Sequence, residues 1–521
     1  MVGVGQSLAK PRTALQLELP AGGRPGVFNV LEMGVVADTS AASTMALQRV
    51  IDACAAAGGG TVLVPSGCYL TGTLWMRNNV TLQLEAGARL VGVPDIQAFP
   101  IVASKWEGSA KPSHAALIAA DGLENIAIIG RGAIDGGGEF WWDLERRHLL
   151  KNDRPAIIRL IHCRNVLVEG ISLTNSAFWT LNPVGCDNVS INRVTIKNPP
   201  DSPNTDGINP DSCSNVHISN CHIDVGDDCI AIKAGTEEDG RGVPRPCENI
   251  TITNCTMHRG HGGVVMGSET HGSIRNVVIS NCVFCETDRG IRLKSRRGRG
   301  GVVEDVRVSN IVMDGVLCPL VINMFYECGA EGASRVMDHS PYPVDHGTPR
   351  FRRLRFSNIT ARRAKYAAAY VLGLPEMFVE DVCIDDVSLY LDPANTQGGP
   401  PAMAPNVPDM CRAGVVVRNA RNIKLRRIDV LDQRGAAVSL TNAEDVVIQN
   451  LSAQRDADHP IVALENVIGI LSDSPLPTAN GNGKLHGHRN GKSRRAGEAT
   501  RGSNGKNGSA ARSNSPQTGR R

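Results

Sequence analysis

The chain of 521 residues lacks any run of 18 or more apolar residues, so the sequence excludes a membrane-spanning helix. Its opening stretch, MVGVGQSLAKPRTALQLELPAGG, also lacks the compact apolar core of a secretory signal. The sequence as written therefore predicts a cytoplasmic protein. An incomplete gene start would leave a secreted or periplasmic location open.

Large apolar residues are almost missing from residues 472–521, which carry ten Lys/Arg and only two Asp/Glu. Such a segment cannot bury enough surface to offset the entropy of ordering. We therefore expect a disordered basic tail, and a solvated extension is preferred to a contact with nucleic acid, which no other feature requires. The remaining chain divides into a poorly defined leader at 1–27 and one folded domain at 28–471.

The sequence also lacks a dense cysteine framework. Its 15 cysteines are odd in number and scattered, which favours buried thiols of a reducing compartment over disulfides.

Short apolar strings introduced by Asn-Val or Asn-Ile recur through the middle of the chain. The Asn positions from 165 onward are separated by 23, 27, 34 and 27 residues. Repeats of this length are typical of solenoids, and alternation with β-branched residues indicates strands. The sequence predicts an all-β, right-handed parallel β-helix. The strings are ENIAIIG at 124, RNVLVEG at 164, DNVSINR at 187, SNVHISN at 214, ENITITN at 248 and RNVVISN at 275.

Three of these coils align without gaps when counted from the asparagines at 215, 249 and 276. Isoleucine then recurs at offset +3, asparagine at +5, cysteine at +6 and an apolar residue at +15 and +17. We expect the isoleucines to fill the core, the +5 asparagines to form an amide stack, and the cysteines to act as small buried hydrophobes. One cysteine per coil does not suit a metal site.

Charged residues converge on one wall in this alignment. Asp227 and Asp228 precede a strand, and His261 aligns with Asp227 one coil later. When five inserted residues are allowed in the previous coil, Asp206 aligns over Asp228. The outward offsets +16 and +18 of the third coil hold an arginine and a lysine. Turn capping could explain any one aspartate. Stacking several like charges on one face is unfavourable, which favours a functional site facing solvent.

Crowded carboxylates push their pKa values apart and so supply an acid and a base together. Glycoside hydrolysis uses such a pair, separated by about 6.5–9.5 Å in inverting enzymes. The neighbouring run DRGIRLKSRRGRGG would suit an anionic sugar. In this run Arg296, Arg297 and Arg299 are expected to form a solvated turn.

Four motifs in this order resemble glycoside hydrolase family 28, the polygalacturonases, over roughly residues 28–470. An N-terminal capping helix is part of the resemblance, although GVVADTSAASTMALQ lacks the usual Gly-Asp-Gly and paired acids. The motifs are SPNTDGINPDS, VGDDCIAIK, RGHGGVVMGS and TDRGIRLKSRRGRGG.

The resemblance implies inverting hydrolysis of α-1,4-galacturonosyl bonds, without cofactor or metal. By motif position Asp227 would be the general acid that protonates the leaving oxygen. Asp206 and Asp228 would hold and deprotonate the water. His261 would keep the acid in its working state.

Substrate contacts follow from the same motifs. Arg292 and Lys294 would bind the galacturonate carboxylate next to the cleaved bond, and Asn204 lies in the first motif. Tyr326, in NMFYECG, is a weaker match to a substrate-facing tyrosine, and a packed aromatic explains it equally well.

The bacterial style of these motifs resembles enzymes that cut from the chain end, and a monomer acting on galacturonan is expected. Other family 28 activities stay open: endo-polygalacturonase, rhamnogalacturonan hydrolase and xylogalacturonan hydrolase. A calcium-dependent pectate lyase and a noncatalytic polysaccharide-binding β-helix are the more distant alternatives.

Overall fold

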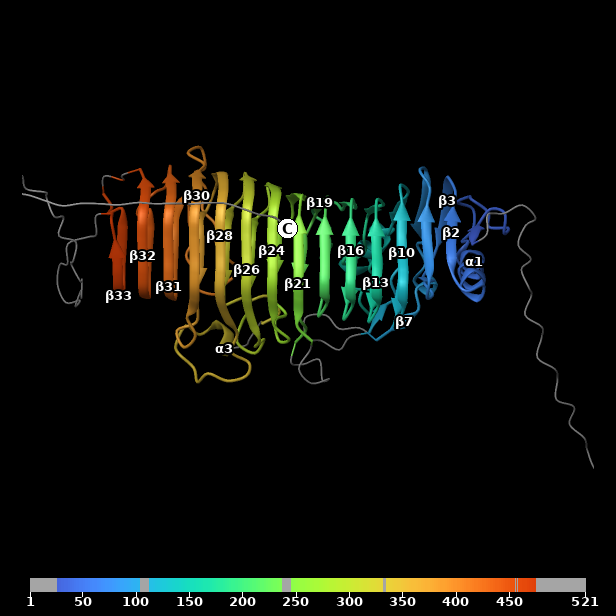
Figure 1. The fold of residues 1–521 in the computed structure, drawn as a ribbon, viewed down its shortest axis with the longest axis horizontal. Coiled ribbons are helices and arrows are strands. Elements are labelled where there is room, and N and C mark those ends of the chain that lie inside the picture. The colour runs from blue at the N-terminus through green and yellow to red at the C-terminus, as the bar shows by residue number, and fades with distance from the viewer. Residues whose placement is uncertain are drawn as a thin grey trace, which may run out of the picture. The chain divides into compact units, whose positions relative to one another are not determined.

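A computed structural model describes residues 26–103, 112–236, 245–330, 334–454, 456 and 458–474. These residues build a parallel β-helix, as the repeat predicts (Figure 1). The predicted basic tail lies almost wholly outside the described residues, so its order stays a prediction, as do the boundaries at 27 and 471. Among the described residues, no helix is long and apolar enough to cross a membrane.

Successive coils stack three series of parallel strands. The first sheet consists of β1 (Val27–Asn29), β2 (Gly60–Val64), β5 (Val80–Leu84), β10 (Glu124–Gly130), β13 (Arg164–Glu169), β16 (Asp187–Asn192), β18 (Ser214–Ser219), β21 (Cys247–Thr253), β24 (Ile274–Cys285), β26 (Val302–Asp314), β28 (Arg350–Ala364), β30 (Val379–Leu391), β31 (Ala413–Leu431), β32 (Val438–Ala453) and β33 (Val462–Ser472). The second consists of β3 (Gly67–Thr71), β6 (Ala88–Gly92), β11 (Ala133–Asp135), β14 (Ser172–Thr174), β17 (Thr195–Lys197), β19 (His222–Val225) and β22 (Thr256–Arg259), and then of the later part of β24 and the strands after it.

The third sheet carries the candidate site. It consists of β4 (Leu74–Trp75), β9 (Ile118–Asp121), β12 (Ile158–Ile161), β15 (Leu181–Val184), β20 (Ile230–Ile232), β23 (Val264–Met266), β25 (Arg289–Lys294), β27 (Cys318–Asn323), β29 (Ala367–Leu372) and the first part of β31. An isolated bridge at Ile208 joins β15 to β20. The short elements outside the three sheets are α1 (Thr44–Ala56), α2 (Gly138–Arg146), α3 (Ser334–Met337), the 3-10 helix Ile96–Ala98 and the antiparallel pair β7 (Ile101–Val102) and β8 (Ser113–His114).

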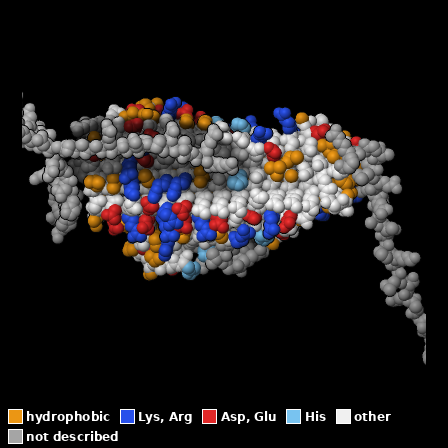
Figure 2. Space-filling view, in the orientation of Figure 1, with side chains coloured by type: hydrophobic (Ala, Val, Ile, Leu, Met, Phe, Trp, Pro, Cys, Tyr) orange, Lys and Arg blue, Asp and Glu red, His pale blue; other side chains and the backbone are white. Residues whose placement is uncertain are grey.

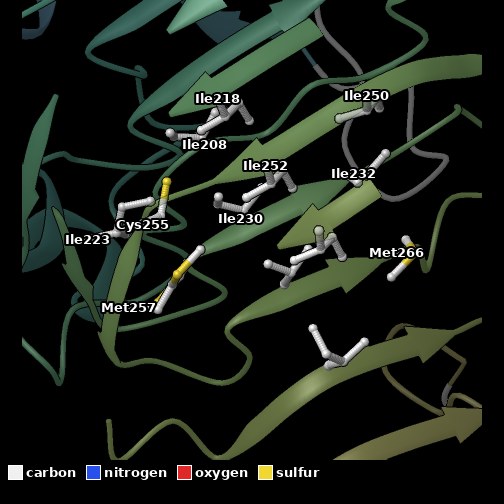
Figure 3. Packing of buried hydrophobic residues seen from close by; sticks show 14 of the residues in the cluster. Ile208, Ile218, Ile223, Ile230, Ile232, Ile250, Ile252, Cys255, Met257 and Met266 are labelled. Atoms are coloured by element: carbon white, nitrogen blue, oxygen red, sulfur yellow. The ribbon is translucent and has the colours of Figure 1, made fainter. Parts of the chain in front are cut away.

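The predicted register is confirmed. Ile218 pairs with Ile252, and Ile252 with Ile279, so offset +3 forms one buried column. Offset +15 forms a second buried column, in which Ile230 pairs with Val264. Figure 3 shows side chains of these columns packed against one another inside the coil. Full burial of an aliphatic side chain is worth about 1.5–3 kcal/mol, so each added coil extends a continuous hydrophobic core.

Asparagine stacks at the turns explain the recurring Asn-Val motif. The side-chain amide of Asn249 donates to Asn215 at 3.1 Å, and that of Asn276 donates to Asn249 at 3.0 Å. All three have φ between 57° and 58°, a left-handed conformation that asparagine tolerates well. The +5 asparagine stack is only partly as predicted, because Asn281 donates to the hydroxyl of Thr253 instead of to Asn254.

Helix α1 packs on the N-terminal coils as the expected capping helix. It buries one face, which consists of Leu47, Val50, Ile51 and Cys54. The spacing of three and four residues is that of an amphipathic helix. This cap covers an end of the solenoid that would otherwise expose core side chains and unpaired strand edges.

The outer surface over β26, β28 and β30 is rich in charge of both signs (Figure 2). Its arginines pair with acids on neighbouring coils, for example Arg353 with Asp305 at 2.8 Å and Arg363 with Asp314 at 2.7 Å. Because these charges are largely matched, this face gives no sign of a binding site.

Candidate active site

The adjacent aspartates lie where a turn becomes a strand, so they escape the alternation of a strand. Asp227 and Asp228 follow β19 and precede β20. The backbone N–H of Asp228 donates to Oδ1 of Asp227 at 2.8 Å, which fixes the first carboxylate against the turn. Gly260 packs against the carbonyl of Asp227 from the next coil with φ of 75°, and a Cβ there would clash with that carbonyl. This close approach requires glycine.

Three carboxylates come together at this point. Asp206, Asp227 and Asp228 each offer an oxygen, and these oxygens all lie within 4.8 Å of one another. These oxygens are closer together than the separation of about 6.5–9.5 Å that is usual for the two carboxyl groups of an inverting enzyme. The reason is the fold: two of the aspartates are adjacent in sequence, and the third lies one coil away, where parallel strands are about 4.8 Å apart.

Asp228 is buried among cations. It is 1% exposed, Nζ of Lys294 lies 2.8 Å from its Oδ2, and Arg292 lies 3.4 Å from its Oδ1. Burial alone would raise the pKa of Asp228, but the charges of Lys294 and Arg292 outweigh it and hold the pKa well below its usual value. Asp228 is therefore ionised throughout the ordinary pH range.

Asp206 has the opposite environment. It is 4% exposed, and Nδ2 of Asn209 donates to its Oδ2 at 2.8 Å. Burial and the neighbouring charge of Asp227 raise the pKa of Asp206 well above its usual value, although Lys233 works against the shift. The pKa values of these two carboxylates are therefore moved apart, mainly by the burial of Asp206 and by the cations beside Asp228, and only in part by the crowding on which the sequence prediction was based.

His261 completes the cluster. Its Nδ1 lies 3.1 Å from Oδ1 of Asp227, and the histidine side chain is 52% exposed. The hydrogen bond and the charge of Asp227 raise the pKa of His261 to about 9, against the effect of burial. The imidazolium form is therefore the resident one at neutral pH. It holds a proton next to Asp227.

The outward positions of β25 hold Arg292 and Lys294, as predicted, but both side chains are nearly buried. Arg292 is 3% exposed and Lys294 6% exposed. Tyr326, 5% exposed, covers them: the Lys294 Nζ lies 4.9 Å and the Arg292 guanidinium 5.6 Å from its ring centroid. The prediction that the wall faces solvent thus holds for His261 and in part for Asp227, but it is wrong for these two cations and for Asp206 and Asp228.

The solvated turn predicted for the following arginines is also wrong. Arg297 and Arg299 are each 3% exposed. Arg297 pairs with Glu376 at 2.6 Å and stacks between the rings of Phe325 and Tyr342, while Arg296 donates to the carbonyl of Gly329 at 2.9 Å. Loops that cover β25 contribute most of these partners, and the repeat pattern gives no information about them.

Asn204 lies on the loop that leads to Asp206. Its Oδ1 accepts a hydrogen bond from Arg154 at 2.8 Å, and the same guanidinium donates to the carbonyls of Ala177 and Pro203. Arg154 is 4% exposed and holds this loop against the β-helix. Arg154, which sequence reasoning missed, thus fixes the side chain of Asn204, which precedes Asp206 by two residues.

A further buried cation was missed altogether. Lys233 pairs with Glu269 at 2.9 Å, both side chains are 6% exposed, and the Lys233 Nζ lies 4.7 Å from the ring centroid of Trp179. Lys233 occupies offset +18 of its coil, the same outward offset as Lys294. That shared offset was the signal that could have found it.

The outer face of the third sheet is covered on the coils that come after the site in the chain. Beyond Lys294 the same outward row continues with Asn323 and Leu372, which are 2% and 1% exposed. The Met403 carbonyl accepts from Nδ2 of Asn323 at 3.0 Å, and Pro400 and Pro401 carbonyls accept from Arg289. On the coil before the site, Asp211 belongs to the same outward row and is only half-buried.

Several buried polar atoms around the carboxylates have no hydrogen-bond partner within the described part of the chain. They are Oδ1 of Asn182, Oδ1 of Asn209 and Nη2 of Arg292. Buried polar groups are nearly always paired, so these atoms mark positions where water or a polar ligand completes the site.

Within the described ranges, these three aspartates are the one set of three or more His, Cys, Asp or Glu side chains that are close enough together to hold a metal ion. Lys294 and Arg292 already occupy the oxygens of Asp228, which disfavours a divalent ion there. A separate hollow of about 460 Å³ over the second sheet is lined by Arg89 and Arg259. Both arginines are paired with aspartates, so it is the weaker candidate.

Comparison with known proteins adds independent evidence. Residues 54–398 match the family model of Glycosyl hydrolases family 28. A probable polygalacturonase of Vitis vinifera is 32% identical over 375 residues, which are 70% of this chain and 74% of the relative. An endo-polygalacturonase of Pectobacterium carotovorum subsp. carotovorum is 33% identical over 308 residues, 56% of this chain and 74% of that protein. The crystal structure of an exopolygalacturonase from Thermotoga maritima has a TM-score of 0.62 at 27% identity and covers 81% of this chain and 91% of its own.

Proposed function

We propose, because this chain belongs to glycosyl hydrolase family 28, that it hydrolyses the α-1,4-galacturonosyl bonds of polygalacturonate or its oligomers. One observation carries the proposal: three carboxylates within 4.8 Å of one another adjoin an Arg292–Lys294 pair covered by an aromatic ring. Carboxylates supply acid and base, and the cations suit the carboxylate of the sugar.

In the proposed mechanism Asp227 is the general acid. It lies at the surface beside the protonated His261, so a proton is available at Oδ1 for the leaving glycosidic oxygen. The proton of this Nδ1–Oδ1 hydrogen bond passes through Asp227 to the leaving oxygen, and His261 is left as a neutral imidazole beside the Asp227 carboxylate. His261 thus keeps the acid in its working state, as the motif resemblance implies.

Asp206 and Asp228 hold the attacking water in this mechanism. Asp228 stays ionised and accepts a hydrogen bond from the water. Asp206 has a raised pKa, and in its ionised form it takes the proton of the water. No step requires a cofactor or metal. We propose inversion at the anomeric carbon, although the carboxylates are closer than in the usual two-carboxylate arrangement.

Substrate binding is assigned to four side chains. Arg292 and Lys294 bind the carboxylate of the sugar next to the cleaved bond. Tyr326 shields the contact between these cations and the sugar carboxylate from water. Shielding strengthens the electrostatic attraction because water screens it less. Asn204, at the end of its loop, offers an amide to a neighbouring sugar.

We propose that cleavage proceeds from the chain end. The covered outer face beyond Lys294, where Asn323 and Leu372 are almost fully buried, supports a binding surface closed on one side. A polymer that enters from the side of Asp211 then has room for few sugars past the cleaved bond. Relatives with both endo and exo names match this chain, so this finer assignment depends on the loops.

Product analysis on polygalacturonic acid tests the proposal. Samples from the first minutes are separated by anion-exchange chromatography, and absorbance from unsaturated sugars is measured alongside. Saturated monomer alone is the expected result. A spread of saturated oligomers would keep the hydrolase but refute exo action. Unsaturated products would indicate a lyase, and binding without turnover would indicate a noncatalytic polysaccharide-binding protein.

A further inference from the structure

The buried pair Lys233–Glu269 has no place in the mechanism above, although it lies beside the carboxylates. Nζ of Lys233 is 2.9 Å from Oε2 of Glu269 and 4.7 Å from the ring centroid of Trp179. Both charged side chains are 6% exposed. A buried ion pair contributes little net stability and can often be replaced by apolar residues at no cost. Its position therefore calls for a role in the site.

Register shows how Lys233 relates to the catalytic cluster. Ile208 pairs with Ile230, so the strand after Asp206 runs directly beside the strand that ends at Lys233. Lys294 stands at the same offset two coils later, and its Nζ turns back to contact Asp228. Lys233 itself pairs with Asp211, so it stands one coil after Asp206 and five residues further along the strand.

We propose that Lys233 is a positioning residue that keeps Asp206 available as a base, and that Glu269 fixes Lys233 and partly offsets its charge. Without Lys233, Asp206 would be buried beside two other carboxylates, and Asn209 would be its one side-chain donor among the described residues. The inference rests on the proposed function for its catalytic meaning, but the electrostatic claim concerns the free protein.

The charges around each member agree with this role. Asp206 faces Asp227 and Asp228, which oppose its ionisation, and Lys233, which favours it. Around Lys233 the anions are Glu269, Asp206 and Asp228. The cations around Glu269 are Lys233, Arg299 and Lys294, which lower the pKa of Glu269 to about 2 although burial would raise it.

Two substitutions of the same ion pair should act in opposite directions. In Lys233→Met the remaining Glu269 charge opposes ionisation of Asp206, so Asp206 should titrate at higher pH than in the wild type. In Glu269→Gln the uncompensated Lys233 favours ionisation, so Asp206 should titrate at lower pH. A purely structural ion pair would give the same effect in both variants.

The test is carboxyl ¹³C NMR of the full chain labelled at aspartate, with Asp206→Asn to assign the signal. Midpoints that move in opposite directions support the proposal, and midpoints that stay unchanged or move together overturn it. Lys233→Arg should restore the wild-type midpoint. If Lys233→Met does not fold, the neutral pair Lys233→Met/Glu269→Gln replaces it. In this double variant Asp206 should titrate at higher pH than in the wild type, and a midpoint equal to or below the wild-type one overturns the proposal.

Kinetics then separate the two proposals. On the acidic side of the pH profile, kcat/KM of Lys233→Met should fall about tenfold, the effect of one neighbouring charge on a carboxylate. If the NMR midpoints move as expected while the acidic limb stays in place, Asp206 is not the base. The proposed mechanism then fails, and the electrostatic role of Lys233 stands.

Discussion

Replacing Asp227 by asparagine separates catalysis from folding, because the amide keeps the shape of the side chain and loses its proton chemistry. Its Oδ1 can still accept the backbone N–H of Asp228, which is 2.8 Å away. The lost ion pair with His261 is half-exposed and is worth less than about 1 kcal/mol. Relief of repulsion with Asp206 and Asp228 offsets part of this loss. We expect the melting temperature to change by less than about 2 °C.

The effect on the reaction should be far larger. A general acid contributes about 10²–10⁴-fold, or roughly 2.7–5.4 kcal/mol of activation free energy. Initial rates of reducing-sugar release measure it, and calorimetric titration with an oligogalacturonate should show nearly unchanged binding. Asp201→Asn, an exposed aspartate on the neighbouring loop, is the matched control and should keep full activity. If Asp227→Asn retains more than about a tenth of the wild-type rate, Asp227 is not the general acid.

Three further predictions follow from the same geometry. Lys294→Met removes a charge-assisted hydrogen bond worth about 1.5–3 kcal/mol, so kcat/KM should fall about 10- to 150-fold, and an unchanged value would remove Lys294 from the substrate site. The pKa of His261 is raised to about 9, so its working imidazolium is present below that pH and lost above it. The kcat/KM profile should therefore fall above about pH 9, and His261→Gln should lack this limb; a limb that persists would belong to another group. A chelator such as EDTA should leave the rate unchanged, since Lys294 and Arg292 occupy the carboxylate that a calcium ion would need, and loss of activity restored by Ca²⁺ would contradict this.

The repeat made most of the coil predictable from the sequence. In a parallel β-helix, residues at equal offsets lie above one another, so aligning three coils was enough to pair Ile218 with Ile252 and Ile230 with Val264. Allowing five inserted residues in the previous coil brought Asp206 over Asp228. The grouping of the aspartates with His261 was predictable for the same reason, whereas the role of each residue came from the motif resemblance and stays a prediction.

The loops between coils were not predictable, because they have no repeat. The covering segment that contacts Asn323 and the loop that buries Arg297 determine how far the site is exposed, and the solvated turn predicted for Arg297 was therefore wrong. Sequence could not show that Lys233 turns toward Glu269, because this contact depends on side-chain direction across two coils. The close spacing of the three aspartates is set by the coil repeat, and the general rule for paired carboxylates gives no information about it.

The anomeric configuration of the first product tests the central claim most directly, because the three carboxylates are closer together than an inverting pair usually is. Hydrolysis of an oligogalacturonate can be followed by ¹H NMR from the first minutes, before mutarotation mixes the anomers. We expect the β-anomer to appear first from the α-linked substrate, as single displacement by a water held between Asp206 and Asp228 requires. Initial appearance of the α-anomer would contradict the account and would make one of these aspartates a nucleophile.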